Sequence, residues 1–148
     1  MNKKELKIGI VGHGFVGKAT DRGFNKNTNK FIVDLKIGTN IDQLADFNPE
    51  LIFVCVPTPM GKNGIQDSSI IEAVVNELSV KCLKSMIVIK STVLPSILQK
   101  IAKTNPKIIY NPEFLREKHA DEDFINSEMI ILGGDRDITS KVSRFYID

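Results

Sequence analysis

The stretch Gly12-His13-Gly14-Phe15-Val16-Gly17 decides the fold of this chain, because a complete G-x-G-x-x-G pattern stands there in a particular setting. A β-branched apolar run at residues 6–11 precedes the glycines, and an amphipathic stretch at residues 15–25 follows them. A glycine loop between a strand and a helix can present the N–H groups of the helix N-terminus to a pyrophosphate. The pattern therefore predicts a dinucleotide-binding unit at the beginning of the chain.

Each position of this loop has its own expected role. Gly12 permits the tight turn, Gly14 lets the backbone approach a pyrophosphate, and Gly17 lets the helix pack closely on the strand. Phe15 and Val16 begin the helix, whose first N–H groups have no partners within it, so they are also expected to bind the cofactor. The alternative interpretation is a glycine-rich turn that binds nothing.

Asp34 argues against that alternative. It ends the second apolar run, and its spacing from the glycines agrees with the roughly 20 residues expected for the acid that binds the adenosine ribose. A carboxylate there accepts hydrogen bonds from the ribose diol and repels a 2′-phosphate. No arginine follows closely, although Lys36 does. The sequence therefore favours NAD over NADP, and Asp34 as a simple turn residue is the alternative.

Short apolar runs recur along the chain, and they are continuously apolar, which is typical of strands buried on both faces of a parallel sheet. They lie at residues 6–11, 31–35, 51–56, 86–89, 107–110 and 129–132. Amphipathic stretches between them predict helices at residues 15–25, 41–47, 68–78, 95–102 and 138–146. This alternation predicts an α/β, doubly wound Rossmann fold with a mostly parallel six-stranded sheet and helices on both faces. We expect residues 1–148 to form one domain.

Composition excludes several classes of protein. The chain has 148 residues, of which 42% are hydrophobic and 26% are charged, as is usual for a globular domain. A net charge of +2 without a basic stripe argues against nucleic-acid binding. No apolar run reaches the length of a membrane span, and we expect no signal peptide. Cys55 and Cys82 show no metal-ligand spacing, so we expect no metal site and a cytoplasmic, reduced setting.

Three further motifs follow predicted strands, where open α/β sheets bind their ligands. They are VCVPTP at residues 54–59, KSTVLP at residues 90–95 and NPEFLRE at residues 111–117. Together with the glycine loop, they make the chain resemble the N-terminal NAD-binding domain of the UDP-glucose/GDP-mannose 6-dehydrogenase family. The resemblance covers nearly the whole chain, and the third motif is the most specific.

Enzymes of that family oxidise the C6 alcohol of a sugar nucleotide to a carboxylate with two NAD+, a reaction that serves polysaccharide biosynthesis. The resemblance implies that Val56, Pro57 and Thr58 line the adenosine and ribose side of the cofactor. It also implies that Ser91 and Thr92 lie near the nicotinamide.

The resemblance also implies catalytic roles. The Thr92 hydroxyl would help to position a water, and Glu113 would be the general base that activates this water for hydrolysis of a covalent thioester. Glu117 would lie near the nicotinamide end, between cofactor and sugar. Phe114 and Leu115 would give Glu113 an apolar environment suited to a base. Without the resemblance, helix caps would be the simpler interpretation of Thr92 and Glu113.

The chain departs from the family in what it lacks. No segment matches the family's nucleophilic cysteine, its lysine helix or most of its sugar-nucleotide pocket. We therefore expect NAD binding without turnover by this chain alone, with a missing C-terminal half or a homodimer completing a site for UDP-glucose or GDP-mannose. Two alternatives stay open: a stand-alone, non-catalytic NAD-binding module, and the cofactor domain of a 3-hydroxyacid-type dehydrogenase.

Overall fold

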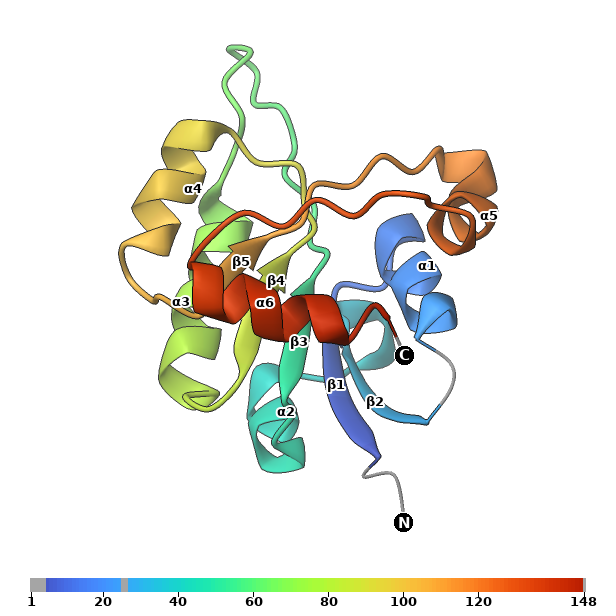
Figure 1. Ribbon diagram of the computed structural model, residues 1–148. Coiled ribbons are helices and arrows are strands. Elements are labelled where there is room, and N and C mark those ends of the chain that lie inside the picture. Colours follow the sequence, from blue (N-terminus) through green and yellow to red (C-terminus); the bar gives the residue numbers. More distant parts are fainter. Residues whose placement is uncertain (1–4, 25–26, 148) are drawn as a thin grey trace.

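Five parallel strands form the centre of the computed structural model, which describes residues 5–24 and 27–147 (Figure 1). The strands lie in the order β2-β1-β3-β4-β5. They are β1 (Leu6–Val11), β2 (Thr28–Val33), β3 (Leu51–Val54), β4 (Met86–Ile89) and β5 (Ile108–Tyr110). The chain runs outward from β1 to β2 and then returns to β3 on the other side of β1. This reversal confirms a doubly wound fold, and it opens a crevice at the carboxyl ends of β1 and β3.

Helices cover both faces of the sheet, as predicted. The α-helices are α1 (Phe15–Gly23), α2 (Ile41–Phe47), α3 (Ser69–Lys81), α4 (Pro95–Ala102), α5 (Ala120–Ile125) and α6 (Arg136–Arg144), and 3-10 turns lie at Leu35–Ile37 and Glu117–His119. Side chains of α2, α3 and α4 form one apolar core with the sheet. Val142 of α6 and Phe24, which ends α1, belong to a second core, and α6 crosses the opposite face in Figure 1.

The strands are apolar throughout because their two faces belong to these two cores. In β3, Leu51 and Phe53 point into the core beneath α6, whereas Ile52 and Val54 point into the core beneath α2 and α3. All four side chains have 0% exposure. Burial on both faces removes the alternation that a half-exposed strand would show.

The expected sixth strand, at residues 129–132, is absent from the described part of the chain. Gly133 instead makes an isolated antiparallel bridge to Tyr110, with two N–H···O bonds of 2.8 Å. Met129, Ile130 and Ile131 are exposed, because this segment passes the end of the sheet without a strand pairing along its length. The sheet therefore has five strands. The last expected residue of the first helix, Asn25, lies outside the described residues.

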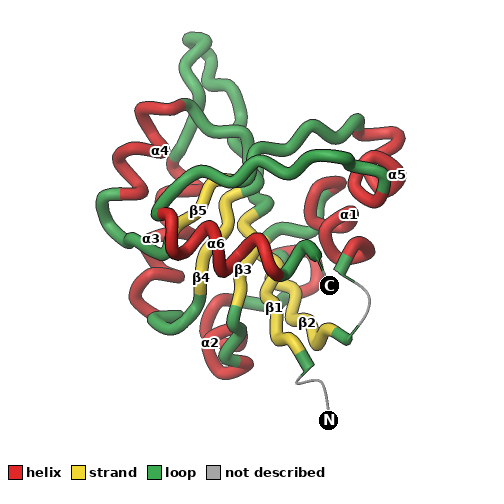
Figure 2. The backbone as a smooth tube through the Cα atoms, viewed as in Figure 1, coloured by secondary structure: helices red, strands yellow, loops and turns green. Residues whose placement is uncertain are grey.

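Residues 111–134 form an arm that leaves the sheet after β5, carries α5 at its tip and returns before α6 (Figure 2). The tip packs on α1, where Phe124 lies against Gly23 so closely that a Cβ at Gly23 would overlap the ring. Arg22 also forms an ion pair with Asp121. Within the arm, Arg116 donates to both carboxylate oxygens of Asp123, at 3.0 and 2.7 Å.

Acid should loosen this arm before it unfolds the sheet. The hydrogen bonds from Arg116 lower the pKa of Asp123 from 3.8 to about 2. A carboxyl group whose pKa is lower in the folded state contributes stability above its unfolded pKa, and that contribution is lost as the pH falls through the folded pKa. Between about pH 4 and pH 2, amide hydrogen exchange in residues 113–131 should therefore rise relative to exchange in α3. In Asp123→Asn the arm should exchange quickly already at pH 7, and equal protection in both proteins would contradict this role.

Candidate functional site

The glycine loop joins β1 to α1 with a distinct constraint at each glycine. Gly12 has φ of +92°, and a Cβ there would lie 2.7 Å from the carbonyl oxygen of Cys55. A Cβ at Gly17 would overlap the carbonyl oxygen of Gly12, so the helix can approach the loop only without a side chain. Apart from Gly14 and its two chain neighbours, no residue has an atom within 4 Å of a Cβ built at Gly14. Two glycines therefore allow close packing, and the third leaves open space in front of the helix.

The N-terminus of α1 faces that open space with unpaired donors. Gly14 is the N-cap residue and supplies no side-chain acceptor, and the first turn contains no acidic residue. The N–H groups of Phe15, Val16 and Gly17 therefore have no carbonyl partner within the helix. An N-terminus of this kind attracts anions through its N–H groups and the helix dipole.

Asp34 lies beside the same loop. One carboxylate oxygen accepts from the backbone N–H of His13 and the other from that of Lys36, both at 2.8 Å. These backbone hydrogen bonds, first that of His13, lower the pKa of Asp34. The carboxylate is therefore charged and held at the carboxyl end of β2. The His13 ring turns to Asp21, at 3.2 Å, which also pairs with Lys30.

The loops after β3 and β4 are joined at the same edge of the sheet. Ser91 Oγ donates to the carbonyl oxygen of Val56, and Thr58 Oγ1 donates to that of Thr92, each at 2.7 Å. Pro57 and the Thr92 side chain are exposed. The structure thus brings together four of the five residues expected along the nicotinamide and ribose side, and Pro57 lies between two of them.

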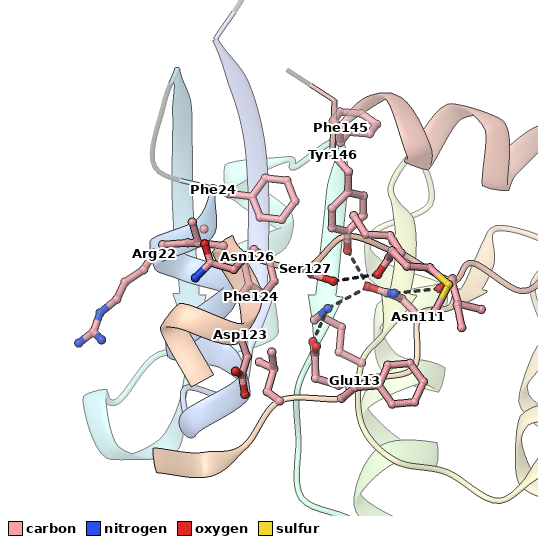
Figure 3. Close-up of a pocket in the computed structure, with 18 of the residues that line it drawn as sticks. Arg22, Phe24, Asn111, Glu113, Asp123, Phe124, Asn126, Ser127, Phe145 and Tyr146 are labelled. Carbon is pink, nitrogen blue, oxygen red and sulfur yellow. Dashed lines mark hydrogen bonds and ion pairs between the residues drawn. The ribbon is translucent and has the colours of Figure 1, made fainter. Parts of the chain in front are cut away.

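A buried polar cluster lies at the carboxyl ends of β4 and β5 (Figure 3). Lys90 Nζ lies 2.5 Å from Glu113 Oε2 and donates to Asn111 Oδ1 at 2.8 Å. Tyr146 Oη donates to the same Asn111 oxygen at 2.7 Å, and Asn111 Nδ2 donates to the Ile131 carbonyl at 2.9 Å. The side chains of Lys90 and Glu113 are 2% and 13% exposed. The cluster therefore ties α6, the arm and the sheet to Glu113.

The protonation states in and beside this cluster decide which groups donate hydrogen bonds. Burial, with further contributions from Glu113 and Cys55, raises the pKa of Tyr146, so its hydroxyl remains a donor. Burial likewise raises the pKa of the Cys55 thiol to about 12. Glu113 Oε2 forms its ion pair with Lys90 but has no hydrogen bond of good geometry among the described residues. That oxygen can therefore accept from one further donor.

Glu113 also lines a cavity of about 1240 Å³ between the arm, α6 and the sheet. Thr92 and Glu117 do not line this cavity. Phe114 and Leu115 line the same cavity, although Phe114 is 71% exposed, and the carboxylate of Glu113 pairs with Lys90. Glu117 begins the 3-10 turn of the arm and is exposed. The three expected catalytic residues are thus not assembled into one cavity by this chain.

Sequence reasoning assigned no role to Lys90, Asn111 or Tyr146. A signal for Lys90 was present, because it continues the face of β4 that Met86 and Val88 give to the core beneath α6. A charged residue in that position is buried and needs a partner. Asn111 likewise continues the face of β5 that Ile109 gives to this core. The position of Tyr146 beside Asn111 depends instead on the path of α6.

Within residues 5–24 and 27–147, no helix is long and apolar enough to cross a membrane. In the same residues, no group of three or more His, Cys, Asp or Glu side chains is placed to hold a metal ion.

Comparison with known proteins agrees with the fold and the motifs. Residues 33–146 match the model of the UDP-glucose/GDP-mannose dehydrogenase family, NAD binding domain. UDP-glucose 6-dehydrogenase of Rickettsia bellii is 36% identical over 93 residues, which are 58% of this chain and 21% of that protein. GDP-mannose 6-dehydrogenase of Pseudomonas aeruginosa is 31% identical over 112 residues, which are 65% of this chain and 26% of that protein.

A solved structure extends the agreement to the whole fold. UDP-glucose dehydrogenase from Pyrobaculum islandicum superposes with a TM-score of 0.79 and 21% identity, covering 99% of this chain and 45% of that one. The chain thus corresponds to only part of each relative.

Proposed function

Because this chain belongs to the UDP-glucose/GDP-mannose dehydrogenase family, we propose that residues 1–148 form the cofactor-binding domain of a nucleotide-sugar 6-dehydrogenase. The family match is to the NAD-binding domain, so NAD is the cofactor. The observation that carries the proposal further is the contact between Asp34 and the glycine loop. It sets an acceptor for a ribose beside donors for a pyrophosphate, which is the pairing that an NAD site needs.

The residues fit the cofactor along the carboxyl edge of the sheet. Asp34 would accept hydrogen bonds from the adenosine ribose, and Gly12, Gly14 and Gly17 would admit the pyrophosphate. The open space in front of Gly14 supports this placement. The first residues of α1, Phe15 and Val16, would donate backbone N–H groups to the phosphates.

The remaining cofactor residues lie on the loops after β3 and β4. Val56, Pro57 and Thr58 would line the ribose side, and Ser91 and Thr92 would lie beside the nicotinamide. Bound NAD+ supplies a hydride acceptor there. The cross-loop hydrogen bonds of Ser91 and Thr58 support this assignment, because they hold the two loops as one surface.

Catalysis in the complete protein would use Glu113 as the general base, with Thr92 positioning a water and Glu117 near the nicotinamide. Burial of Glu113 beside Lys90, with one carboxylate oxygen that has no hydrogen bond among the described residues, supports the role of Glu113. The relatives of this chain are named for UDP-glucose and GDP-mannose, so we propose a sugar nucleotide as the substrate of the complete protein. The match to the family model disfavours a 3-hydroxyacid-type dehydrogenase.

Calorimetric titration of the chain with NAD+ and NADP+ tests the proposal. Asp34→Ala should weaken NAD+ binding about 10- to 100-fold, because a charge-assisted hydrogen bond contributes about 1.5–3 kcal/mol. NADP+ should bind the native chain poorly, since its 2′-phosphate meets the Asp34 carboxylate. Asp46→Ala, an exposed acid on α2, is the matched control and should bind NAD+ normally. NAD+ binding that is insensitive to Asp34→Ala would contradict the ribose contact.

The same solutions test whether this chain can catalyse the reaction without the rest of the complete protein. With NAD+ and either UDP-glucose or GDP-mannose added, the chain alone should form no NADH, because no segment of it matches most of the family's sugar-nucleotide pocket, its lysine helix or its nucleophilic cysteine. NADH formation would show that this chain is catalytically sufficient, contrary to the proposal.

A further inference from the structure

The loop after β3 projects beyond the sheet, as the green segment before α3 in Figure 1 shows, and its own hydrogen bonds close it. Met60 and Gln66 form an antiparallel bridge. The loop is closed by hydrogen bonds from Gly61 N to the Ile65 carbonyl, at 2.7 Å, and from Asp67 N to the Pro59 carbonyl, at 2.8 Å. The bridge to Met60 and these hydrogen bonds therefore hold the backbone of Gln66 in place.

Both ends of the Gln66 side-chain amide are bonded to the loop after β4. Nε2 donates to the Thr92 carbonyl at 3.0 Å, and Oε1 accepts from the Leu94 N–H at 3.1 Å. Thr58 Oγ1 donates to the same Thr92 carbonyl. An amide can do this because it carries a donor and an acceptor on one planar group. Gln66 thus spans the backbone on both sides of Val93.

The two hydrogen bonds of the Gln66 amide fix the backbone at Thr92 and leave the Thr92 side chain free. The Thr92 carbonyl has two donors, whereas its hydroxyl has no hydrogen-bond partner within the part of the chain that the structure describes. The residue after Leu94 is proline, which has no N–H, so Leu94 supplies the last backbone donor before α4. Without Gln66, the Leu94 N–H would lose its partner and the loop would gain conformational freedom.

We infer that Gln66 is a positioning residue for the nicotinamide half of the cofactor, acting through the loop at residues 91–94. The inference rests on the proposed function, which places Ser91 and Thr92 beside the nicotinamide. Gln66 lies outside the glycine loop and does not contact Asp34, so the adenosine half should be bound independently of it. Its removal should affect one half of the cofactor selectively.

Binding of NAD+ and of ADP-ribose, which lacks only the nicotinamide ring, separates the two halves. Gln66→Ala should weaken NAD+ binding about three- to tenfold, as expected for the loss of one or two hydrogen bonds that order the loop at residues 91–94. ADP-ribose binding should change less than about twofold. Gln66→Glu keeps the shape and the acceptor for Leu94 but cannot donate to the Thr92 carbonyl, so it should not restore NAD+ affinity. Gln99→Ala, on the exposed side of α4, is the matched control and should behave as the native chain.

The outcomes divide clearly. An unchanged ratio of NAD+ to ADP-ribose affinity in Gln66→Ala, whether both fall equally or neither falls, overturns the inference and leaves the proposed function intact. A native chain that binds neither ligand overturns the proposed function and the inference with it. A selective loss of NAD+ affinity in both Gln66 variants supports the positioning role.

Discussion

Gly17→Ala is expected to lose both cofactor binding and a large part of the folding stability. The added Cβ would overlap the carbonyl oxygen of Gly12, which is backbone and cannot rotate away. Helix α1 must therefore move off the loop, at a cost of about 3 kcal/mol in the free energy of unfolding. NAD+ binding should weaken about 100-fold or more, since the displaced helix N-terminus loses two charge-assisted hydrogen bonds to phosphate.

Gly14→Ala is the matched variant that separates binding from folding. Its φ of −74° suits alanine, and the new methyl group meets no atom within 4 Å in the free chain. Its unfolding free energy should stay within about 1 kcal/mol of the native value. NAD+ binding should nevertheless fall as far as in Gly17→Ala, because the methyl group fills the space assigned to the pyrophosphate.

Urea unfolding followed by far-ultraviolet circular dichroism suits both variants, because the chain contains no tryptophan. Calorimetry supplies the affinities. Native stability in Gly17→Ala would refute the packing constraint at the helix. Native NAD+ affinity in Gly14→Ala would refute the placement of the pyrophosphate.

Lys90→Met should destabilise the chain by about 3–5 kcal/mol, because it leaves the Glu113 carboxylate without its charged partner in a buried position. Lys90 is 2% exposed and Glu113 13% exposed, so the pair is largely removed from bulk solvent. Asn111 would also lose the donor that shares its oxygen with Tyr146. A loss of this size is a large fraction of the about 5–15 kcal/mol that stabilises a typical domain.

The double variant Lys90→Met/Glu113→Gln tests the cause of that loss. Removing both charges should restore most of the unfolding free energy, since the cost comes from an unpaired charge and not from the missing pair itself. Urea unfolding at pH 7 measures all three proteins. If Lys90→Met alone were as stable as the native chain, the ion pair would contribute nothing to the fold.

The sequence predicts the centre of this fold well, for a physical reason. Strands such as residues 51–54 are buried on both faces and therefore carry an unmistakable apolar run. The run at residues 129–132 is equally apolar but forms no strand. An apolar run suits a buried strand, but only the three-dimensional path of the chain decides whether a neighbouring strand is available to pair with it. That path brings Gly133 into an isolated bridge with Tyr110 at the end of β5, and the run itself forms no strand in the described part of the chain.

The candidate site was likewise predictable from the sequence only in part. The glycines and Asp34 were predictable because their spacing follows from one local unit of strand, loop and helix. The cluster around Glu113 was not, because it depends on contacts between residues 90, 111, 113 and 146, which come together only through tertiary packing. The motif at residues 111–117 pointed to Glu113, and the alternation of faces in β4 indicates that Lys90 is buried, but neither pattern identifies the two residues as partners.

The arm that carries α5 is closed at its base by three hydrogen bonds, two between Tyr110 and Gly133 and one from Asn111 to Ile131. Its two ends therefore leave and rejoin the sheet at one point, whatever lies between them. Lengthening a closed loop costs little, since each doubling of its length adds only about 0.6 kcal/mol of closure entropy. Added residues in the arm beside Glu113 should thus leave the register of the five-stranded sheet unchanged, as long as α5 keeps its packing on α1.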